Sequence, residues 1–276
     1  MAEIKKILIA NRGEIVQRAI RTIKEMGKKS VAVYSAGDKN ASYLKHADEA
    51  VCIGGAKSSE SYLNIPALIT AAEMTGCDAI FPGYGFLSEN QDFVEICKLH
   101  NIKFIGPSSE VMEKMADKSK AKEEMVRAGV PVVPGSKGAV RTLDEGKKIA
   151  REIGYPIMAK ASAGGGGRGM RLIKEEKDFD SQYLAASSEA LAAFGDGTMY
   201  LERFINNPRH IEVQVIGDSH GNAIHIGERD CSLQRRHQKV IEESPAILLN
   251  DETRAKLHEV AVKATKYLKY EGAGTF

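Results

Sequence analysis

The stretch from Ala159 to Met170 holds the residues best suited to bind a phosphate group. Lys160 lies near its start, four consecutive glycines follow at 164–167, and Arg168 comes next. Because glycine has no Cβ, the main chain can approach a polyanion closely and present N–H groups to it, while the two side chains add positive charge. We therefore expect a phosphate-binding loop. A mobile glycine-rich linker is the simpler alternative, and the loop alone does not exclude it.

Short apolar segments on both sides of this loop predict that it joins the two strands of a hairpin. Residues 157–159 precede it and residues 170–173 follow it. The dinucleotide-binding fingerprint needs a helix directly after its glycines, and the Walker motif ends in Gly-Lys-Ser/Thr, so neither describes this loop. A glycine-rich hairpin resembles instead the lid with which ATP-grasp ligases cover a nucleotide.

A cation cluster at residues 229–239 is the second candidate for chemistry. Such a cluster suits phosphate or a small carboxylate such as bicarbonate. A solvated basic face paired with Glu228, Glu242 and Glu243 is the alternative. A nucleic-acid site fits less well, because the segment is short and lacks interleaved aromatic residues for base stacking. The cluster comprises Arg229, Arg235, Arg236, His237 and Lys239.

Residues 209–216 alternate with period two, which predicts a strand with a polar and an apolar face. His210, Glu212 and Gln214 share the polar face. A turn at 217–222 leads into a second antiparallel strand at 223–226. A lone histidine on a strand is more often structural than catalytic, so His210 gains weight only from the neighbouring cation cluster.

The composition describes an ordinary globular chain whose anion sites must be local. Its 276 residues fit about two domains. The formal net charge of +2 provides no overall field that would attract nucleic acid or an acidic membrane. The apolar run at residues 7–10 is too short for a signal-peptide core or a membrane span. We therefore expect a cytoplasmic protein that binds neither nucleic acid nor membranes.

The four cysteines are far apart and form no Cys-x-x-Cys pair, which is the spacing of neither a zinc site nor a disulfide framework. We expect them to be reduced thiols in the core. They are Cys52, Cys77, Cys97 and Cys231.

Strand and helix patterns alternate over residues 7–105, which predicts a parallel α/β sheet. Ligands of such sheets collect at the carboxyl ends of the strands, so the loops at 11–14 and 82–89 are candidate site loops. Tight turns at Gly83 and Gly85 are an equally good interpretation. Prolines at 131 and 134 then mark a boundary.

The expected fold class is α/β, with a Rossmann-like parallel-sheet N-terminal domain, an ATP-grasp lid and the start of an ATP-grasp central domain. The predicted divisions are the N-terminal domain at 1–115, a helical connection at 116–130, the lid at 131–204 and an incomplete ATP-grasp C-terminal domain at 205–276.

Four sequence blocks resemble the biotin carboxylase component of acetyl-CoA carboxylase or pyruvate carboxylase. They span the chain and are specific in combination. Carbamoyl-phosphate synthetases and purine-pathway ligases share the grasp architecture, but the block at 234–239 is similar to biotin carboxylases rather than to them. The four blocks are residues 9–15, 81–90, 160–171 and 229–243.

The resemblance implies ATP-dependent carboxylation of biotin on biotin carboxyl carrier protein, with bicarbonate as the carbon source, magnesium as the metal and a carboxyltransferase component as a further partner. It also implies a homodimer for the full-length protein. The choice between acetyl-CoA carboxylase, in fatty acid biosynthesis, and pyruvate carboxylase stays open.

The resemblance also assigns residues to the site. By similarity, Lys118 and Lys160 contact the nucleotide phosphates beneath Gly165, Gly166 and Gly167. Further nucleotide-binding residues are Met170, Glu202, Arg203, Ile205, His210 and His237. Gln234 and Lys239 are implied to hold bicarbonate as catalytic residues. At Arg203 and Ile205 some relatives have lysine and leucine, and this departure matters little because the adenine contact there is partly made by the main chain.

The last residues, 272–276, predict the start of a strand. In the family this strand continues into the magnesium-binding glutamates, so the resemblance implies no metal ligand within these residues and a chain that is inactive alone, with apolar surface left uncovered. Two other functions stay open. One is a nucleotide-binding module without catalysis, and the other is a different ATP-grasp ligase that joins a carboxylate to an amine.

Overall fold

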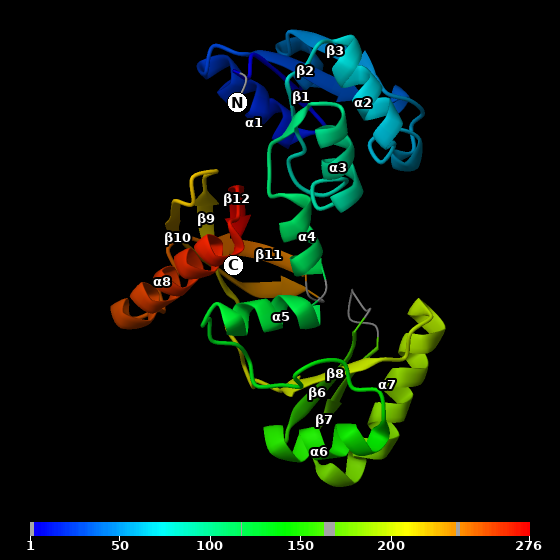
Figure 1. Ribbon diagram of the computed structural model, residues 1–276, viewed down its shortest axis with the longest axis vertical. Coiled ribbons are helices and arrows are strands. Elements are labelled where there is room, and N and C mark those ends of the chain that lie inside the picture. Colours follow the sequence, from blue (N-terminus) through cyan, green and yellow to red (C-terminus); the bar gives the residue numbers. More distant parts are fainter. Residues whose placement is uncertain (1–2, 117, 163–168, 236–237) are drawn as a thin grey trace. The chain divides into compact units, whose positions relative to one another are not determined.

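The computed structural model describes residues 3–116, 118–162, 169–235 and 238–276, and only the backbone of residues 118 and 119. The chain divides into two compact units, residues 1–113 and 114–276. Figure 1 shows the elements of each unit in chain order.

The N-terminal unit is built on a parallel sheet with the strand order β3-β2-β1-β4-β5. This confirms the expected parallel α/β sheet. The strands are β1 (Lys6–Ile9), β2 (Lys29–Tyr34), β3 (Glu49–Cys52), β4 (Ala79–Phe81) and β5 (Lys103–Phe104).

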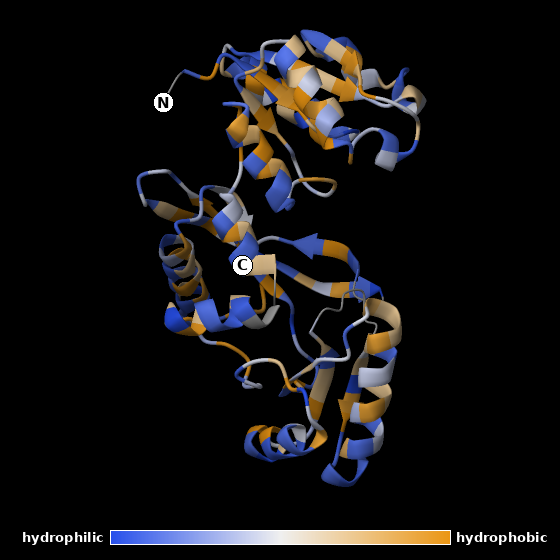
Figure 2. Ribbon diagram, turned by 45° about the vertical axis from the view of Figure 1, so that its right-hand side comes forward, coloured by the Kyte–Doolittle hydropathy of each residue, from blue (hydrophilic) through white to orange (hydrophobic). Residues whose placement is uncertain are grey.

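Successive side chains of a strand point in opposite directions, so β1 presents apolar side chains to both faces of the sheet. Helices cover both faces. Ile7 and Ile9 of β1 pack with the apolar stripe of α1 (Glu14–Glu25). Leu8 and Ala10 pack instead with α2 (Ile65–Met74) and α3 (Gln91–Leu99). Figure 2 shows hydrophobic residues concentrated on the strands and inner helix surfaces of this unit.

The two predicted site loops of this unit lie side by side at the carboxyl ends of β1 and β4, which are adjacent strands. Asn11 joins them, since its amide donates to the carbonyls of Pro82 (2.8 Å) and Tyr84 (2.7 Å). Its side chain is only 3% exposed. Gly83 has φ +66°, and a Cβ there would lie 2.9 Å from the Asn11 amide nitrogen, so the turn requires glycine.

Two short helices follow, α4 (Ser109–Ala116) and α5 (Lys118–Arg127). In the C-terminal unit, α5 packs through Met125 against α8 (Asp251–Leu268).

The C-terminal unit contains two antiparallel sheets. The first has the order β7-β6-β8 and consists of β6 (Ile157–Ala161), β7 (Met170–Ile173) and β8 (Met199–Arg203). Strands β6 and β7 pair from Ile157↔Ile173 to Lys160↔Met170, which confirms the predicted hairpin. One face of this sheet is covered by α6 (Leu143–Ile153) and α7 (Phe179–Phe194).

The second sheet has the order β11-β10-β9-β12. Its strands are β9 (Ile211–Gly217), β10 (Ala223–Arg235), β11 (Gln238–Glu243) and β12 (Gly272–Thr275). Strand β10 is much longer than the predicted 223–226 and runs through the cation cluster. A register shift between His225 and Glu228 lets it bend and continue along β9. Helix α8 packs on one face, where Ala261 meets Val213 and Val215.

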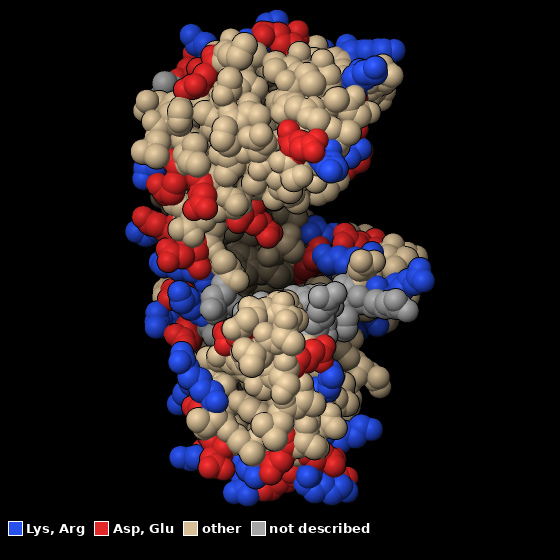
Figure 3. Space-filling view, turned by 90° about the vertical axis from the view of Figure 1, so that its right-hand side faces the viewer, with Lys and Arg blue, Asp and Glu red and all other residues tan. Residues whose placement is uncertain are grey.

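Three cysteines are buried as expected, but Cys52 is exposed, so the prediction of a core thiol is wrong there. Strand β3 is the edge of its sheet, which leaves Cys52 uncovered. None of the described helices combines the length and the apolar character needed to cross a membrane. Acidic and basic side chains are intermixed on the face drawn in Figure 3, in keeping with the near-balanced net charge.

Candidate functional site

The first sheet of the C-terminal unit has one face covered by helices and one open face, and the open face carries three predicted nucleotide-binding residues, Lys160, Met170 and Glu202. Ala159 and Leu201 are buried against α6 and α7. The strand residues that alternate with Ala159 and Leu201 point to the opposite face of the sheet. Lys160 lies opposite Tyr200 on β8 and opposite Met170 on β7. We call this surface the lid face, defined by Met158, Lys160, Met170, Leu172, Tyr200 and Glu202.

An ion pair between Lys160 and Glu202 crosses the lid face. Both side chains are half-buried, with 31% and 21% of their surfaces exposed. The amine can therefore reach a ligand while the carboxylate neutralises it in the absence of one. The glycines that follow β6 in the sequence make this end of the strand the expected position of a nucleotide phosphate.

Arg203 and Ile205 are not brought onto the lid face by their side chains. The Arg203 guanidinium donates to the carbonyl of Ile153, at the end of α6. Its main-chain N–H donates to the carbonyl of Pro134 at 2.8 Å. Only its carbonyl is left for an adenine edge. Ile205 lies beyond the strand and is 48% exposed.

Some predicted residues lie outside the described part of the chain. Glycines 165–167 and His237 are among the residues that are not described, and Lys118 is described only by its backbone, at the first position of α5.

The second sheet has a polar face of its own, opposite α8. Glu212 lies at its centre and is 5% exposed. The Arg229 Nε donates to its Oε1 at 2.6 Å, and the Lys239 ammonium pairs with its other oxygen. Burial by itself would raise the pKa of Glu212, but the hydrogen bonds from Lys239 and Arg229 outweigh it and hold the pKa below its usual value.

Lys239 has a second carboxylate partner, Glu242, at 3.3 Å. The pKa of Lys239 is raised, chiefly by the hydrogen bond to Glu212. The cation cluster is thus partly neutralised, as the alternative interpretation suggested. Glu242 takes part as predicted, Glu212 is an additional partner, and Glu228 pairs elsewhere. Glu228 points to the opposite face and binds Arg254 and His258 of α8. The sequence did not indicate Glu212 as the main partner, because its partners are 17 and 27 residues away.

Gln234 and His210 are brought together at 2.6 Å, between the Gln234 Nε2 and the His210 Nδ1. The Gln234 amide also donates to the carbonyl of Cys231 at 2.9 Å. The structure therefore links one predicted nucleotide residue with one predicted bicarbonate residue. Gln234 also pairs with Lys239 across β10 and β11.

Glu212, Cys231 and Glu242 could in principle hold a metal ion, because their ligand atoms lie within 4.8 Å of one another. Arg229 and Lys239 already neutralise the two carboxylates. A divalent cation would have to displace both, so we assign no metal to this cluster.

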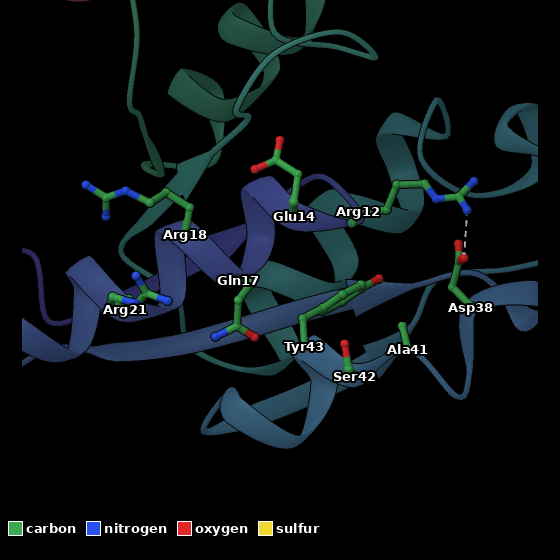
Figure 4. Close-up of a pocket in the computed structure, with 10 residues that line it drawn as sticks. Arg12, Glu14, Gln17, Arg18, Arg21, Asp38, Ala41, Ser42 and Tyr43 are labelled. Atoms are coloured by element: carbon green, nitrogen blue, oxygen red, sulfur yellow. Dashed lines mark hydrogen bonds and ion pairs between the residues drawn. The ribbon is translucent and has the colours of Figure 1, made fainter.

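The N-terminal unit has a pocket of about 610 Å³ beside the first half of α1. Figure 4 shows that Arg12 reaches away from the helix to pair with Asp38, at 2.9 Å. Arg18 and Arg21 project from the helix itself, and Ser42 and Tyr43 lie below it. This pocket contains the predicted loop residues Arg12, Gly13 and Glu14 but none of the predicted nucleotide-binding residues.

One residue that contacts the lid face was not predicted from the sequence. Lys122 of α5 places its ammonium within hydrogen-bonding distance of the Tyr200 hydroxyl and 4.8 Å from the centre of that ring. Its position four residues after Lys118 could have indicated it, since such residues share one side of a helix.

Two family descriptions together match almost the whole chain. Residues 3–112 match "Biotin carboxylase, N-terminal domain". Residues 117–276 match "Carbamoyl-phosphate synthase L chain, ATP binding domain".

The chain is also similar to individual proteins. The biotin carboxylase of Nostoc sp. is 56% identical over 270 residues, which are 98% of this chain and 60% of that protein. The crystal structure of a biotin carboxylase–β,γ-ATP complex from Campylobacter jejuni is 70% identical with a TM-score of 0.91, over 99% of this chain and 61% of the other.

A third similar protein is the biotin carboxylase domain dimer of 2-oxoglutarate carboxylase from Hydrogenobacter thermophilus, solved with MgADP, ADP and bicarbonate. It is 49% identical with a TM-score of 0.88, over 100% of this chain and 60% of that one. The chain thus spans about 60% of the length of these relatives.

The lid hairpin and these matches define an ATP-grasp protein. Within that class, the chain belongs to the biotin carboxylase family. The resemblance seen in the four sequence blocks is confirmed.

Proposed function

We propose that this chain provides the nucleotide- and bicarbonate-binding parts of an enzyme that carboxylates biotin on a carrier protein at the expense of ATP. The observation that carries the proposal is the lid face, where Lys160 and Glu202 pair on the open side of a sheet whose connecting loop contains four glycines. A carboxylate and an amine on one strand face, next to a loop of this kind, suit the adenine and the phosphates of a nucleotide respectively.

In the proposed complex, Lys118, Lys160 and Gly165, Gly166 and Gly167 hold the phosphates. Glu202 and the main chain at Arg203 and Ile205 border the adenine, and Met170 packs on it from β7. His210 and His237 complete the nucleotide site. Arg203 takes part in this arrangement only through its main chain, because its guanidinium is bound to the end of α6.

Gln234 and Lys239 are proposed to hold bicarbonate. An ammonium has three N–H donors, and Glu212 and Glu242 occupy two of those of Lys239. One donor is left for an anion, and Lys239 is 36% exposed. Bicarbonate oxygen then attacks the γ-phosphorus and ADP leaves. The carboxyphosphate formed breaks down to CO₂ and phosphate, the phosphate takes the proton of biotin N1, and N1 adds to the CO₂. Such phosphoryl transfer depends mainly on positioning and on neutralising charge.

Magnesium would neutralise the β- and γ-phosphate oxygens in this reaction. We assign none of its ligands to the described residues. A related domain dimer was solved with MgADP and bicarbonate, which supports both ligands for this family. A biotin carboxyl carrier protein, a carboxyltransferase component and homodimer formation are proposed on the same family basis.

The domain divisions at 1–115, 116–130, 131–204 and 205–276 are retained as part of the proposal, and so is a cytoplasmic location. Relatives include biotin carboxylase parts of 2-oxoglutarate carboxylase and of pyruvate carboxylase. These similarities therefore do not separate a role in fatty acid synthesis from one in another carboxylation.

Calorimetric titration of the 276-residue chain with ADP, followed by a ¹³C-bicarbonate NMR titration of the ADP complex, tests the proposal. We expect saturable binding of ADP and broadening of the bicarbonate resonance that Lys239→Met abolishes. If the chain binds ADP but does not bind bicarbonate, the result would favour a nucleotide-binding module or a different ATP-grasp ligase. Absence of ADP binding would refute the nucleotide site.

A further inference from the structure

We infer that Lys122 is an additional nucleotide-binding residue, which contacts the phosphates of a bound adenine nucleotide beside Lys160. The inference deepens the proposed function and rests on it. Neither the four sequence blocks nor the resemblance assigned a role to this residue.

The position of the Lys122 ammonium is set by three surrounding segments. Helix α5 carries the residue, and strand β8 presents the Tyr200 hydroxyl to it. The third segment is the loop at Gly135, where a Cβ would lie 2.8 Å from the ammonium nitrogen and 2.7 Å from the Tyr200 hydroxyl. Gly135 bridges to Glu202 along the edge of β8. The ammonium is therefore held over the lid face itself.

Lys122 contacts the row of the lid face that Lys160 and Tyr200 form. Tyr200, which it contacts, is the cross-strand neighbour of Lys160, the last lid-face residue of β6. Glu202 pairs with Met158, one row further from the loop. A phosphate held by Lys160 would thus be within reach of the second amine.

The charge balance on the lid face supports an anion as the missing partner. Glu202 neutralises Lys160. Among the residues that the structure describes, Lys122 has no carboxylate within salt-bridge distance, and its ammonium donates a hydrogen bond to the neutral phenol of Tyr200. The three charged groups sum to one positive charge on a half-buried surface. Such a charge costs free energy until a counter-ion compensates it.

The titratable groups that face Lys122 agree with this account. Burial lowers its pKa, and the charge of Lys160 also lowers it while Glu202 opposes the change. The pKa of Tyr200 is raised, by burial and by Glu202, so its hydroxyl stays protonated and cannot serve as a counter-ion. A nucleotide phosphate would compensate the positive charge of Lys122 and would also be a partner for Lys160.

The alternative is a structural role, in which Lys122 only fastens α5 to β8 through Tyr200. Lys122→Met removes the charge and the hydrogen bond, whereas Lys122→Gln removes the charge but keeps a donor for Tyr200. Lys122→Arg keeps the charge. Tyr200→Phe removes the hydroxyl and leaves the amine. Lys266→Met is the matched control, because it removes one positive charge from an exposed position of the same unit.

The test is calorimetric titration of these variants with adenosine and with ADP. We expect Lys122→Met and Lys122→Gln to weaken ADP binding about tenfold and adenosine binding less than about twofold, because only ADP has phosphates. Lys122→Arg and Lys266→Met should stay within about threefold of the wild-type chain for ADP.

Equal loss of adenosine and ADP binding in Lys122→Gln, or unchanged ADP binding in Lys122→Gln and Lys122→Met, would overturn the inference while the proposed function stands. A matching loss in Tyr200→Phe would overturn it in favour of the structural role. If the wild-type chain binds no ADP, the proposed function and the inference fail together. Should Lys122→Met not fold, Lys122→Gln decides.

Discussion

Lys160 on β6 and Glu202 on β8 form an ion pair on the one face of their sheet that α6 and α7 leave uncovered. The two residues are 42 positions apart in the chain, and antiparallel pairing of the strands places them one row apart. Neither side chain is fully buried, so the pair can open for a ligand at modest cost.

Replacing Lys160 by methionine should weaken ADP binding by about tenfold or more, since the phosphate loses an ionised donor. The thermal stability should change little, because half-exposed ion pairs contribute less than about 1 kcal/mol. Calorimetry with ADP and a thermal melt of the same sample measure both effects. Lys266→Met again serves as the control. Lost stability with unchanged ADP affinity would show that the pair is structural.

Replacing Glu212 by glutamine should destabilise the second sheet by about 3 kcal/mol, because removing one partner of a buried ion pair leaves uncompensated charge. Here Arg229 and Lys239 both lose their buried partner and keep only the more exposed Glu242. The free energy of unfolding from urea titrations checks the value. Glu243→Gln, at an exposed position of β11, provides the comparison. Equal stability of the two variants would contradict the prediction.

The contribution of Glu228 to stability should disappear in acid. This carboxylate is 2% exposed. Burial would raise its pKa, but Arg254, His258 and the Ala246 N–H lower it from 4.5 to about 2. A carboxylate with a lowered folded-state pKa stabilises the fold above its unfolded pKa and ceases to do so as pH falls through the folded value.

The loss should therefore occur between about pH 4.5 and pH 2. Urea unfolding of the wild type and of Glu228→Gln at pH 7 and at pH 3 measures it. We expect the difference between the two proteins to shrink at the lower pH. A difference that is the same at both values would mean that the proton-linked interaction is absent.

ADP affinity should fall in alkaline solution at a lower pH than an ordinary lysine would cause. The pKa of free Lys122 is lowered, chiefly by burial, so its ammonium is lost earlier as pH rises, and with it the contact to phosphate. Arginine stays protonated over this range. Titrations with ADP at a series of pH values should thus show a decline in the wild type that is reduced in Lys122→Arg. Parallel curves would assign the decline to Lys160 or to other groups.

The sequence by itself determined the class of the fold and the family. Alternation of strands with helices predicted the parallel sheet, because apolar periodicity is a local property of each element. Two apolar segments around four glycines predicted the hairpin of β6 and β7 for the same reason. The residues expected to bind the nucleotide at Lys160 and Glu202 do share one face, which follows from the period of two in a strand.

Only the tertiary structure decided which charges meet. Glu212 forms ion pairs with Arg229 and Lys239, whereas Glu228, which directly precedes Arg229 in the chain, faces α8. Neighbouring residues of β10 point to opposite faces, and the pairing of β10 with β9 after the register shift decides which face each of them occupies. Likewise, Lys122 comes to Tyr200 across 78 positions through the packing of α5 in the C-terminal unit. Long-range contacts of this kind have no local signature, because they arise only when separate elements bury their apolar faces together.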